Sequence, residues 1–206
     1  MNNFVKRILS SIILIPLALY IIVQGSFVLM FFTVTCFLVS CYEWHKMTKK
    51  KFYKIYGFPF LFCSFFTFYE LDLFLVFFVI LICISTDIGG YFFGKIFKGP
   101  KLTKISPNKT YAGMIGGYFL SLISLTVIIN LIDYSHIPIQ IFLLTLLIST
   151  VSQIGDIIVS YFKRLSKTKD TGRIIPGHGG LLDRIDGMIF AFPIVYLINL
   201  TEFINV

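Results

Sequence analysis

The sequence predicts an all-α integral membrane protein, a polytopic bundle of about seven transmembrane helices. Hydrophobic residues make up 57% of the 206 residues and charged residues 14%, well below the roughly 25% charged residues of a soluble domain. This composition excludes an ordinary soluble domain and a disordered chain. The net charge of +8 would suggest nucleic acid in a soluble protein, but in a membrane protein it is typical of basic cytoplasmic loops. We therefore expect no nucleic-acid partner.

Seven apolar runs approach the length of about 20 residues that one helical membrane crossing needs. We expect a single membrane domain over residues 1–206, with N-terminal helices in 1–70 and the helices and loops that carry the polar motifs in 71–206. The runs cover residues 8–23, 26–42, 55–69, 73–93, 111–132, 137–162 and 187–201.

The placement of positive charge supports this count. If all seven runs cross the membrane, all 18 Lys and Arg residues fall on one side, at the N-terminus and in the second, fourth and sixth connections. The opposite connections carry Glu70, Asp72 and Asp133. Because positive charge near helix ends marks the cytoplasmic face, the pattern predicts a cytoplasmic N-terminus, an outer C-terminus and cytoplasmic basic loops.

Two carboxylates, Asp87 and Asp156, stand inside apolar runs, where insertion of one costs about 2.5–3.5 kcal/mol. Asp156 is followed at helical spacing by Ser160, Lys163 and Arg164, so the four side chains share one helix face. Such a face indicates the wall of a polar site at the cytoplasmic end. The alternative is a protonated or lysine-paired Asp that fixes helix packing.

The basic loop beyond this face carries two motifs. Asp183 and Asp186 are three residues apart, so on a helix both carboxylates face the same way, and paired carboxylates suit Mg²⁺. The glycine-rich stretch before them lets the backbone approach an anion, as nests of N–H groups do around phosphates; the alternative is an ordinary turn. The charged and glycine residues of this loop include Lys169, Asp170, His178, Gly179, Gly180 and Arg184.

The other long basic loop, residues 94–109, leads into the fifth run through Ser106, Lys109 and Thr110. Hydroxyl groups, a lysine and a helix N-terminus together favour a bound anion. The alternative is a capped helix start on a basic loop, and these residues alone favour that alternative.

These motifs together resemble the signature of phosphatidate cytidylyltransferases, the CDP-diacylglycerol synthases. The signature residues run from Ser160-Tyr-Phe-Lys163-Arg164 through Lys169-Asp170-Thr-Gly to Pro-Gly-His178-Gly-Gly-Leu-Leu-Asp183-Arg-Ile-Asp186. Residues 86–95 and 106–113 are similar to the family's upstream motifs. The resemblance covers the C-terminal part of the chain, and the N-terminal runs match only in being hydrophobic.

The resemblance implies the reaction CTP + phosphatidate → CDP-diacylglycerol + pyrophosphate, catalysed within residues 71–206. It implies a multi-pass protein of the bacterial inner membrane with its active site facing the cytoplasm, and it leaves open a homodimer. Mg²⁺ is the expected cofactor, held by Asp156, Asp183 and Asp186, and a monovalent cation such as K⁺ is left open. Lys163 and Arg164 join these carboxylates as expected catalytic residues. The expected substrate-binding residues are Ser160, Lys169, Asp170, His178, Gly179, Gly180, Arg184, Asp87, Ser106, Lys109 and Thr110.

Two other functions compete with this interpretation. A CDP-alcohol phosphotransferase also places aspartate pairs on membrane helices, but its usual motif of two Asp pairs interleaved with Gly and an Ala-Arg is not found here. A membrane carrier of an anionic nucleotide or phosphate would use the same basic vestibule. Transport predicts a passage through the bundle and no dependence on Mg²⁺.

Overall fold

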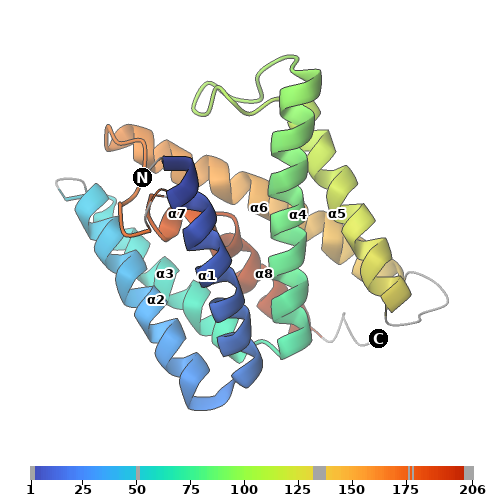
Figure 1. The fold of residues 1–206 in the computed structure, drawn as a ribbon, viewed down its shortest axis with the longest axis horizontal. Helices are drawn as coiled ribbons and strands as arrows, with labels where there is room; N and C mark the ends of the chain where they lie inside the picture. Colours follow the sequence, from blue (N-terminus) through green and yellow to red (C-terminus); the bar gives the residue numbers. More distant parts are fainter. Residues whose placement is uncertain (1–2, 50–51, 132–137, 176, 178, 202–206) are drawn as a thin grey trace. The chain divides into compact units, whose positions relative to one another are not determined.

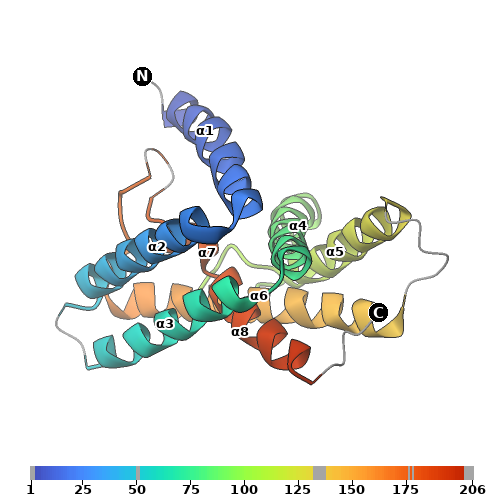
Figure 2. The same cartoon turned by 90° about the horizontal axis from the view of Figure 1, so that it is seen from below.

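The computed structural model describes residues 3–49, 52–131, 138–175, 177 and 179–201, and among these residues the regular elements are helices joined by loops (Figure 1; Figure 2). Each of the seven apolar runs is helical over most of its described residues, and a short extra helix, α7, precedes the last of them. The helices are α1 (Asn3–Gln24), α2 (Ser26–Met47), α3 (Lys54–Glu70), α4 (Leu73–Phe97), α5 (Tyr111–Leu131), α6 (Ile139–Leu165), α7 (Leu182–Ile185) and α8 (Met188–Asn199).

Four of these helices, α2, α4, α5 and α6, are long and apolar enough to cross a membrane. Two shorter apolar helical stretches cover Ile12–Gln24 and Met188–Asn199. Many of the large apolar side chains on these helices are exposed, among them Phe27, Phe31 and Leu131. Exposed apolar surface of this extent is unusual in a soluble monomer and is expected where lipid covers the helices. The chain is therefore a multi-pass membrane protein.

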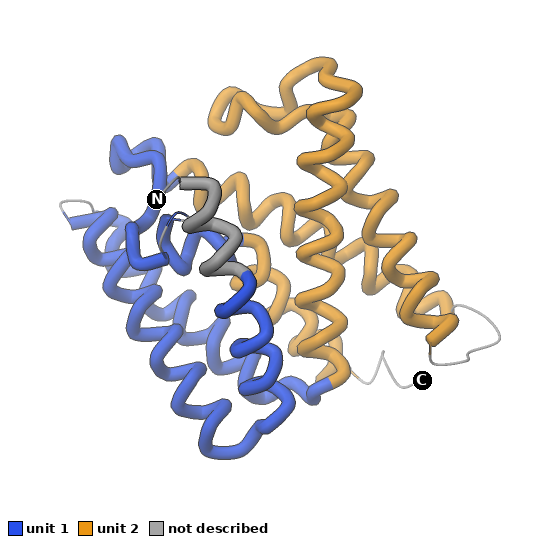
Figure 3. The backbone as a smooth tube through the Cα atoms, viewed as in Figure 1, with its two compact units in different colours: residues 1–73, 162–186 blue, residues 74–161, 187–206 orange. Residues whose placement is uncertain are grey.

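The chain divides into two compact units (Figure 3). Unit 1 comprises residues 1–73 and 162–186, and so holds α1, α2, α3, the end of α6 and α7. Unit 2 comprises residues 74–161 and 187–206, and so holds α4, α5, most of α6 and α8. The polar motifs fall into both units, and each unit is described by itself.

In unit 1, α2 packs against α1 and α3. Gly57 of α3 lies directly on the indole of Trp44, where a Cβ atom would overlap the ring. The indole N–H donates to the Lys54 carbonyl at 3.0 Å, and the Phe162 ring lies 5.2 Å from Trp44. These contacts fix the end of α6 beside α2 and therefore place the next residue, Lys163.

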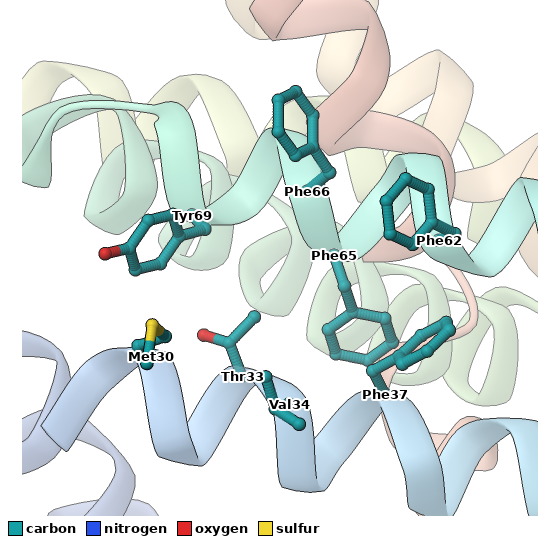
Figure 4. Close-up of a pocket in the computed structure, with 8 residues that line it drawn as sticks. All are labelled: Met30, Thr33, Val34, Phe37, Phe62, Phe65, Phe66 and Tyr69. Atoms are coloured by element: carbon teal, nitrogen blue, oxygen red, sulfur yellow. The ribbon is translucent and has the colours of Figure 1, made fainter. Parts of the chain in front are cut away.

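A cavity of about 170 Å³ lies between α2 and α3 of unit 1 (Figure 4). Phe37 of α2 meets Phe62 and Phe65 of α3 edge-to-face, with ring centroids 6.0 and 5.9 Å apart. The lining is mainly aromatic and aliphatic and comprises Met30, Thr33, Val34, Phe37, Phe62, Phe65, Phe66 and Tyr69.

Unit 2 is held by small residues and hydroxyl groups. A Cβ atom at Gly89 of α4 would overlap the backbone carbonyl of Gly116 in α5, so the two helices approach backbone to backbone. Hydrogen bonds between helices join Ser85 to Ser124, Thr86 to Ser149 and Tyr118 to Thr150, at 2.6, 3.0 and 2.9 Å. Close approach at small residues and interhelical hydrogen bonds are the usual means of packing helices in lipid.

Candidate active site

The polar loop of unit 1 brings three of the expected residues together. Lys163, in the last turn of α6, extends its ammonium group to Asp183 Oδ1 at 3.0 Å and to Asp186 at 3.8 Å. The side chains are only 11%, 6% and 13% exposed, in the order Lys163, Asp183, Asp186. The expectation that Asp183 and Asp186 face the same way is confirmed, since both contact one lysine. The result is a nearly enclosed cluster of one cation and two carboxylates.

The second oxygen of Asp183 organises the loop itself. Asp183 Oδ2 accepts hydrogen bonds from the backbone N–H groups of Thr171 at 2.9 Å and Gly180 at 3.1 Å. Gly179 has a φ of +89°, and a Cβ there would lie 3.1 Å from the same oxygen. The Ile175 N–H donates to the Gly179 carbonyl at 2.9 Å, which closes the loop. The N–H of Gly180 is thus used within the protein, by Asp183.

Most of the other charged residues expected to act in this loop are exposed. Arg164, Lys169, Asp170 and Arg184 are exposed, so their charged groups can reach a ligand in solution. His178 lies outside the described residues. The exposed cations that neighbour the cluster in sequence are suited to binding phosphate groups, and the two carboxylates of the cluster are suited to a cation.

Unit 2 holds a second lysine–aspartate pair. Lys109 pairs with Asp156 of α6, with side chains 23% and 29% exposed. Ser160, one turn further along α6, is buried. Asp87 lies in the middle of α4 at an exposed position. The lysine-paired Asp156 shows the arrangement named above as the alternative to a polar site, and the pair remains accessible enough for either role.

The segment that carries Lys109 is a tight turn ending in a helix cap. The Lys109 N–H donates to the Ser106 carbonyl at 3.0 Å, and Lys101 and Thr110 form an isolated antiparallel bridge. Thr110 Oγ1 accepts the N–H of Gly113 at 3.1 Å, which is the hydrogen bond of an N-cap residue. The capped helix start is therefore present, and it places Lys109 next to Asp156.

The carboxylate oxygens of Asp183 and Asp186 are the kind of ligand that a magnesium ion takes. Mg²⁺ takes oxygen ligands and commonly only one or two protein carboxylates, the rest being water and substrate phosphate. A carboxylate has about four lone-pair positions, of which Asp183 uses three, for Lys163, Thr171 and Gly180. No group of three or more His, Cys, Asp or Glu side chains with metal-binding geometry occurs among the described residues, so water and phosphate would have to complete the coordination.

The sequence analysis missed one carboxylate of this region, Glu43. It lies near the end of α2, is 0% exposed, and accepts hydrogen bonds from Thr171, Leu181 and Leu182. A signal was available in the sequence: Glu43 directly follows an apolar run at the end where the charge pattern otherwise places only lysines. Its partners lie more than 120 positions away in sequence, and no local pattern identifies them.

Comparison with known proteins gives consistent results along the chain. The Cytidylyltransferase family profile matches residues 5–71 and 52–201. A phosphatidate cytidylyltransferase of Rickettsia typhi is 34% identical over 213 residues, which cover 97% of this chain and 93% of that protein. The similarity therefore includes the N-terminal helices, for which the motif comparison had found only hydrophobicity in common with the family.

Other relatives match a shorter part of the chain at higher identity. Phosphatidate cytidylyltransferases of Brucella suis and Staphylococcus saprophyticus are 44% and 40% identical over 117 and 124 residues, or 55% and 60% of this chain. The chain spans 42% and 48% of the length of those two proteins. With the family profile matching most of its length, the chain belongs to the cytidylyltransferase family and is a nucleotidyltransferase enzyme.

Proposed function

We propose that this protein transfers the cytidylyl group of CTP to phosphatidate, giving CDP-diacylglycerol and pyrophosphate. A phosphate oxygen of phosphatidate forms a bond to the α-phosphorus of CTP, and the bond from that phosphorus to the bridging oxygen of the β-phosphate breaks. The observation that carries the proposal is the Lys163–Asp183–Asp186 cluster where α6, a helix long enough to span a membrane, ends in a polar loop. A lipid and a water-soluble nucleotide can both reach such a position.

The charges of the loop fit the demands of this reaction. Both substrates are anionic, so the reaction needs cations that offset their repulsion and hold the two phosphates in line. Lys163 is held in one orientation by Asp183 and supplies a fixed positive charge. Arg164, Lys169 and Arg184 supply exposed ones, and His178 is proposed to join them. A phosphate oxygen is already ionised and needs little help from a general base.

Asp156, Asp183 and Asp186 are the residues proposed to hold Mg²⁺. The ion, when bound, neutralises phosphate oxygens of CTP and so makes the α-phosphorus easier to attack. The proposed substrate-binding set is completed by residues of both polar loops and of the membrane helices, which are Ser160, Asp170, Gly179, Gly180, Asp87, Ser106, Lys109 and Thr110.

The proposal includes an orientation in the membrane. Seven crossings with a cytoplasmic N-terminus place every Lys and Arg on the cytoplasmic side, where CTP is available. The bacterial relatives support placement in the bacterial inner membrane. One chain contains all the residues proposed for the reaction, so a homodimer would contain two such sites.

An enzymatic assay tests the function directly. The purified protein is incubated with radiolabelled CTP, phosphatidate and Mg²⁺, and the label is followed into the lipid extract. We expect labelled CDP-diacylglycerol, and none when diacylglycerol, which lacks the nucleophilic phosphate, replaces phosphatidate. Absence of labelled lipid would refute the proposal. Uptake of labelled CTP into proteoliposomes would favour a carrier instead, and release of CMP from CDP-diacylglycerol by an alcohol would favour a phosphotransferase.

Cysteine labelling tests the orientation. With Cys36, Cys41, Cys63 and Cys83 replaced, a cysteine at Lys104 should react with a membrane-impermeant reagent only from the cytoplasmic side. A cysteine at Glu70, in the opposite connection, should react only from outside. Reaction of both variants from the same side would contradict the proposed topology.

A further inference from the structure

Glu43 is the most deeply buried acidic side chain with described contacts in unit 1. It is 0% exposed near the end of α2. Its Oε1 accepts the N–H of Leu181 at 3.0 Å, and its Oε2 accepts the N–H of Leu182 at 2.9 Å and the hydroxyl of Thr171 at 3.2 Å. A carboxylate is costly to bury unless hydrogen bonds satisfy it, and here three donors from one loop do so.

The glycines of the loop are shaped around this carboxylate. A Cβ atom at Gly172 would meet only Glu43 atoms among its three nearest neighbours, and the closest would be Oε1. A Cβ at Gly180 would overlap the Thr171 hydroxyl and lie against the same carboxylate. Neither glycine has a left-handed backbone. Close approach of Glu43, and not a special turn conformation, therefore explains why glycine stands at these two positions.

Glu43 and Asp183 both accept hydrogen bonds from Thr171 and from residues 180–182. Thr171 gives its N–H to Asp183 and its hydroxyl to Glu43. Gly180 gives its N–H to Asp183, and the next two N–H groups go to Glu43. Displacing these residues from Glu43 would therefore displace the N–H groups that orient Asp183. Lys163, the partner of Asp183, would be displaced with it.

We propose that Glu43 is a positioning residue for the transfer reaction: it anchors Thr171, Leu181 and Leu182 to α2 and thereby sets the orientation of Asp183 and Lys163. This rests on the proposed function in so far as Asp183 and Lys163 act on substrate. α7 has only four residues and cannot fix its own entry, since its first N–H groups have no partner within the helix. Glu43 supplies that partner from a long helix.

The first experiment separates positioning from folding. In Glu43→Gln one carboxylate oxygen becomes an N–H donor, so one backbone N–H loses its acceptor at unchanged side-chain size. We expect kcat to fall about 10- to 100-fold, the loss typical of small misplacement of reacting groups, with KM for CTP changed much less. Glu70→Gln, at an exposed position, is the matched control and should leave kcat unchanged. Wild-type kcat in folded Glu43→Gln would overturn the proposal.

Thr171 provides a milder variant should Glu43→Gln fail to fold. Thr171→Val removes the hydroxyl at nearly constant volume and should lower kcat by a smaller factor than Glu43→Gln does. Thr171→Ser keeps the hydroxyl and should have a kcat close to that of the wild-type protein. Hydrogen–deuterium exchange of peptides covering Thr171 and Leu181–Leu182 should rise in Glu43→Gln and Thr171→Val, and α5 should be unaffected. Unchanged exchange in these peptides would overturn the proposal even where activity is lost.

A double substitution tests the contact without any substrate. Gly172→Ala should lower the thermal unfolding midpoint in wild-type protein but have a much smaller effect in a Glu43→Ala background, because the atoms that the methyl group meets are gone. Equal effects in both backgrounds would overturn the proposal. Should the wild-type protein make no CDP-diacylglycerol, the proposed function fails, while the exchange and stability results still decide whether Glu43 anchors the loop.

Discussion

Unit 1 and unit 2 each hold a lysine against an aspartate at the end of an apolar helix, but they enclose the pair to different degrees. Lys163 and Asp183 of unit 1 are 11% and 6% exposed, and backbone N–H groups hold the carboxylate from its other side. Lys109 and Asp156 of unit 2 are 23% and 29% exposed. An enclosed pair with fixed donors keeps one geometry, whereas a more open pair can be separated by an incoming ligand at lower cost.

The packing around the two lysine–aspartate pairs also fixes the pair of unit 1 more firmly than the pair of unit 2. Unit 1 places its pair on a loop that a buried glutamate and an aromatic cluster fix to α2. Unit 2 builds a rigid bundle from glycine contacts and hydroxyl hydrogen bonds, and presents Lys109 on the turn before α5. The comparison indicates a preorganised lysine–aspartate pair in unit 1 and a more adjustable pair in unit 2.

The largest expected effect is on catalysis. Asp183→Asn replaces one carboxylate oxygen by an N–H donor, which opposes either Lys163 or the two backbone N–H groups. We expect CDP-diacylglycerol formation to fall about 100- to 1,000-fold, the loss typical of removing one preorganised electrostatic group. Asp156→Asn should cause a loss of similar size with a smaller change in unfolding temperature. Near-normal turnover in either folded variant would remove that residue from the proposed catalytic set.

The next largest expected effect is on the free energy of unfolding, and it compares alanine substitutions of Lys163 and Lys109. Lys163→Ala takes the lysine away from the largely buried carboxylate of Asp183, a change that costs about 3–5 kcal/mol. Lys109→Ala leaves one partly exposed carboxylate and should cost about 1 kcal/mol or less. Thermal unfolding of both variants in the same mild detergent measures the difference. Equal midpoints would show that the exposure difference between the pairs has no energetic consequence.

The elements that the sequence predicted well are those set by local pattern. Each apolar run is helical over most of its described residues, because a stretch that must satisfy its backbone in lipid has no other local solution. The common orientation of Asp183 and Asp186 followed from their spacing and is confirmed by their shared contact with Lys163. Crossing of the membrane by all seven runs stays a prediction, since four helices meet the length and composition needed.

The contacts that organise the site depend on residues far apart in sequence and could not be predicted. Nothing near Glu43 indicates that its partners are Thr171 and Leu182, because these residues lie 128 and 139 positions further along the chain. The glycine-rich loop illustrates the ambiguity. Its pattern fits a phosphate nest, yet the N–H groups of Gly180 and Leu181 are given to Asp183 and Glu43.

A smaller effect tests the glycine packing of unit 2. Gly89→Ala places a methyl group on the backbone carbonyl of Gly116, whereas the nearest atom to a Cβ at Gly90 is 3.7 Å away. We expect Gly89→Ala to cost about 1–3 kcal/mol, as overpacking does, and the neighbouring Gly90→Ala to cost little. Thermal unfolding distinguishes them. If both variants unfold at the wild-type temperature, α4 and α5 do not approach as closely as described.

The smallest effect compares one hydroxyl in each unit. Tyr118 of α5 bonds to Thr150 of α6 at 2.9 Å, and Tyr53 bonds to Ser166 at 2.9 Å. Thr150 already donates its hydroxyl hydrogen to the Leu146 carbonyl at 2.7 Å, so Tyr118 is the donor in its pair. Tyr118→Phe should therefore cost about 0.6 kcal/mol, the average for hydrogen bonds between membrane helices.

Tyr53→Phe should cost less, because Tyr53 and Ser166 lie at helix ends where water can replace the lost partner. Each variant removes a single oxygen and leaves the ring contacts in place, so the comparison isolates the hydrogen bond. Replicate unfolding curves in one detergent can resolve the two values. A larger cost for Tyr53→Phe would mean that the end of α6 depends on this bond as well as on the Trp44 ring, and the fixed geometry of unit 1 would then rest on more than its buried carboxylates.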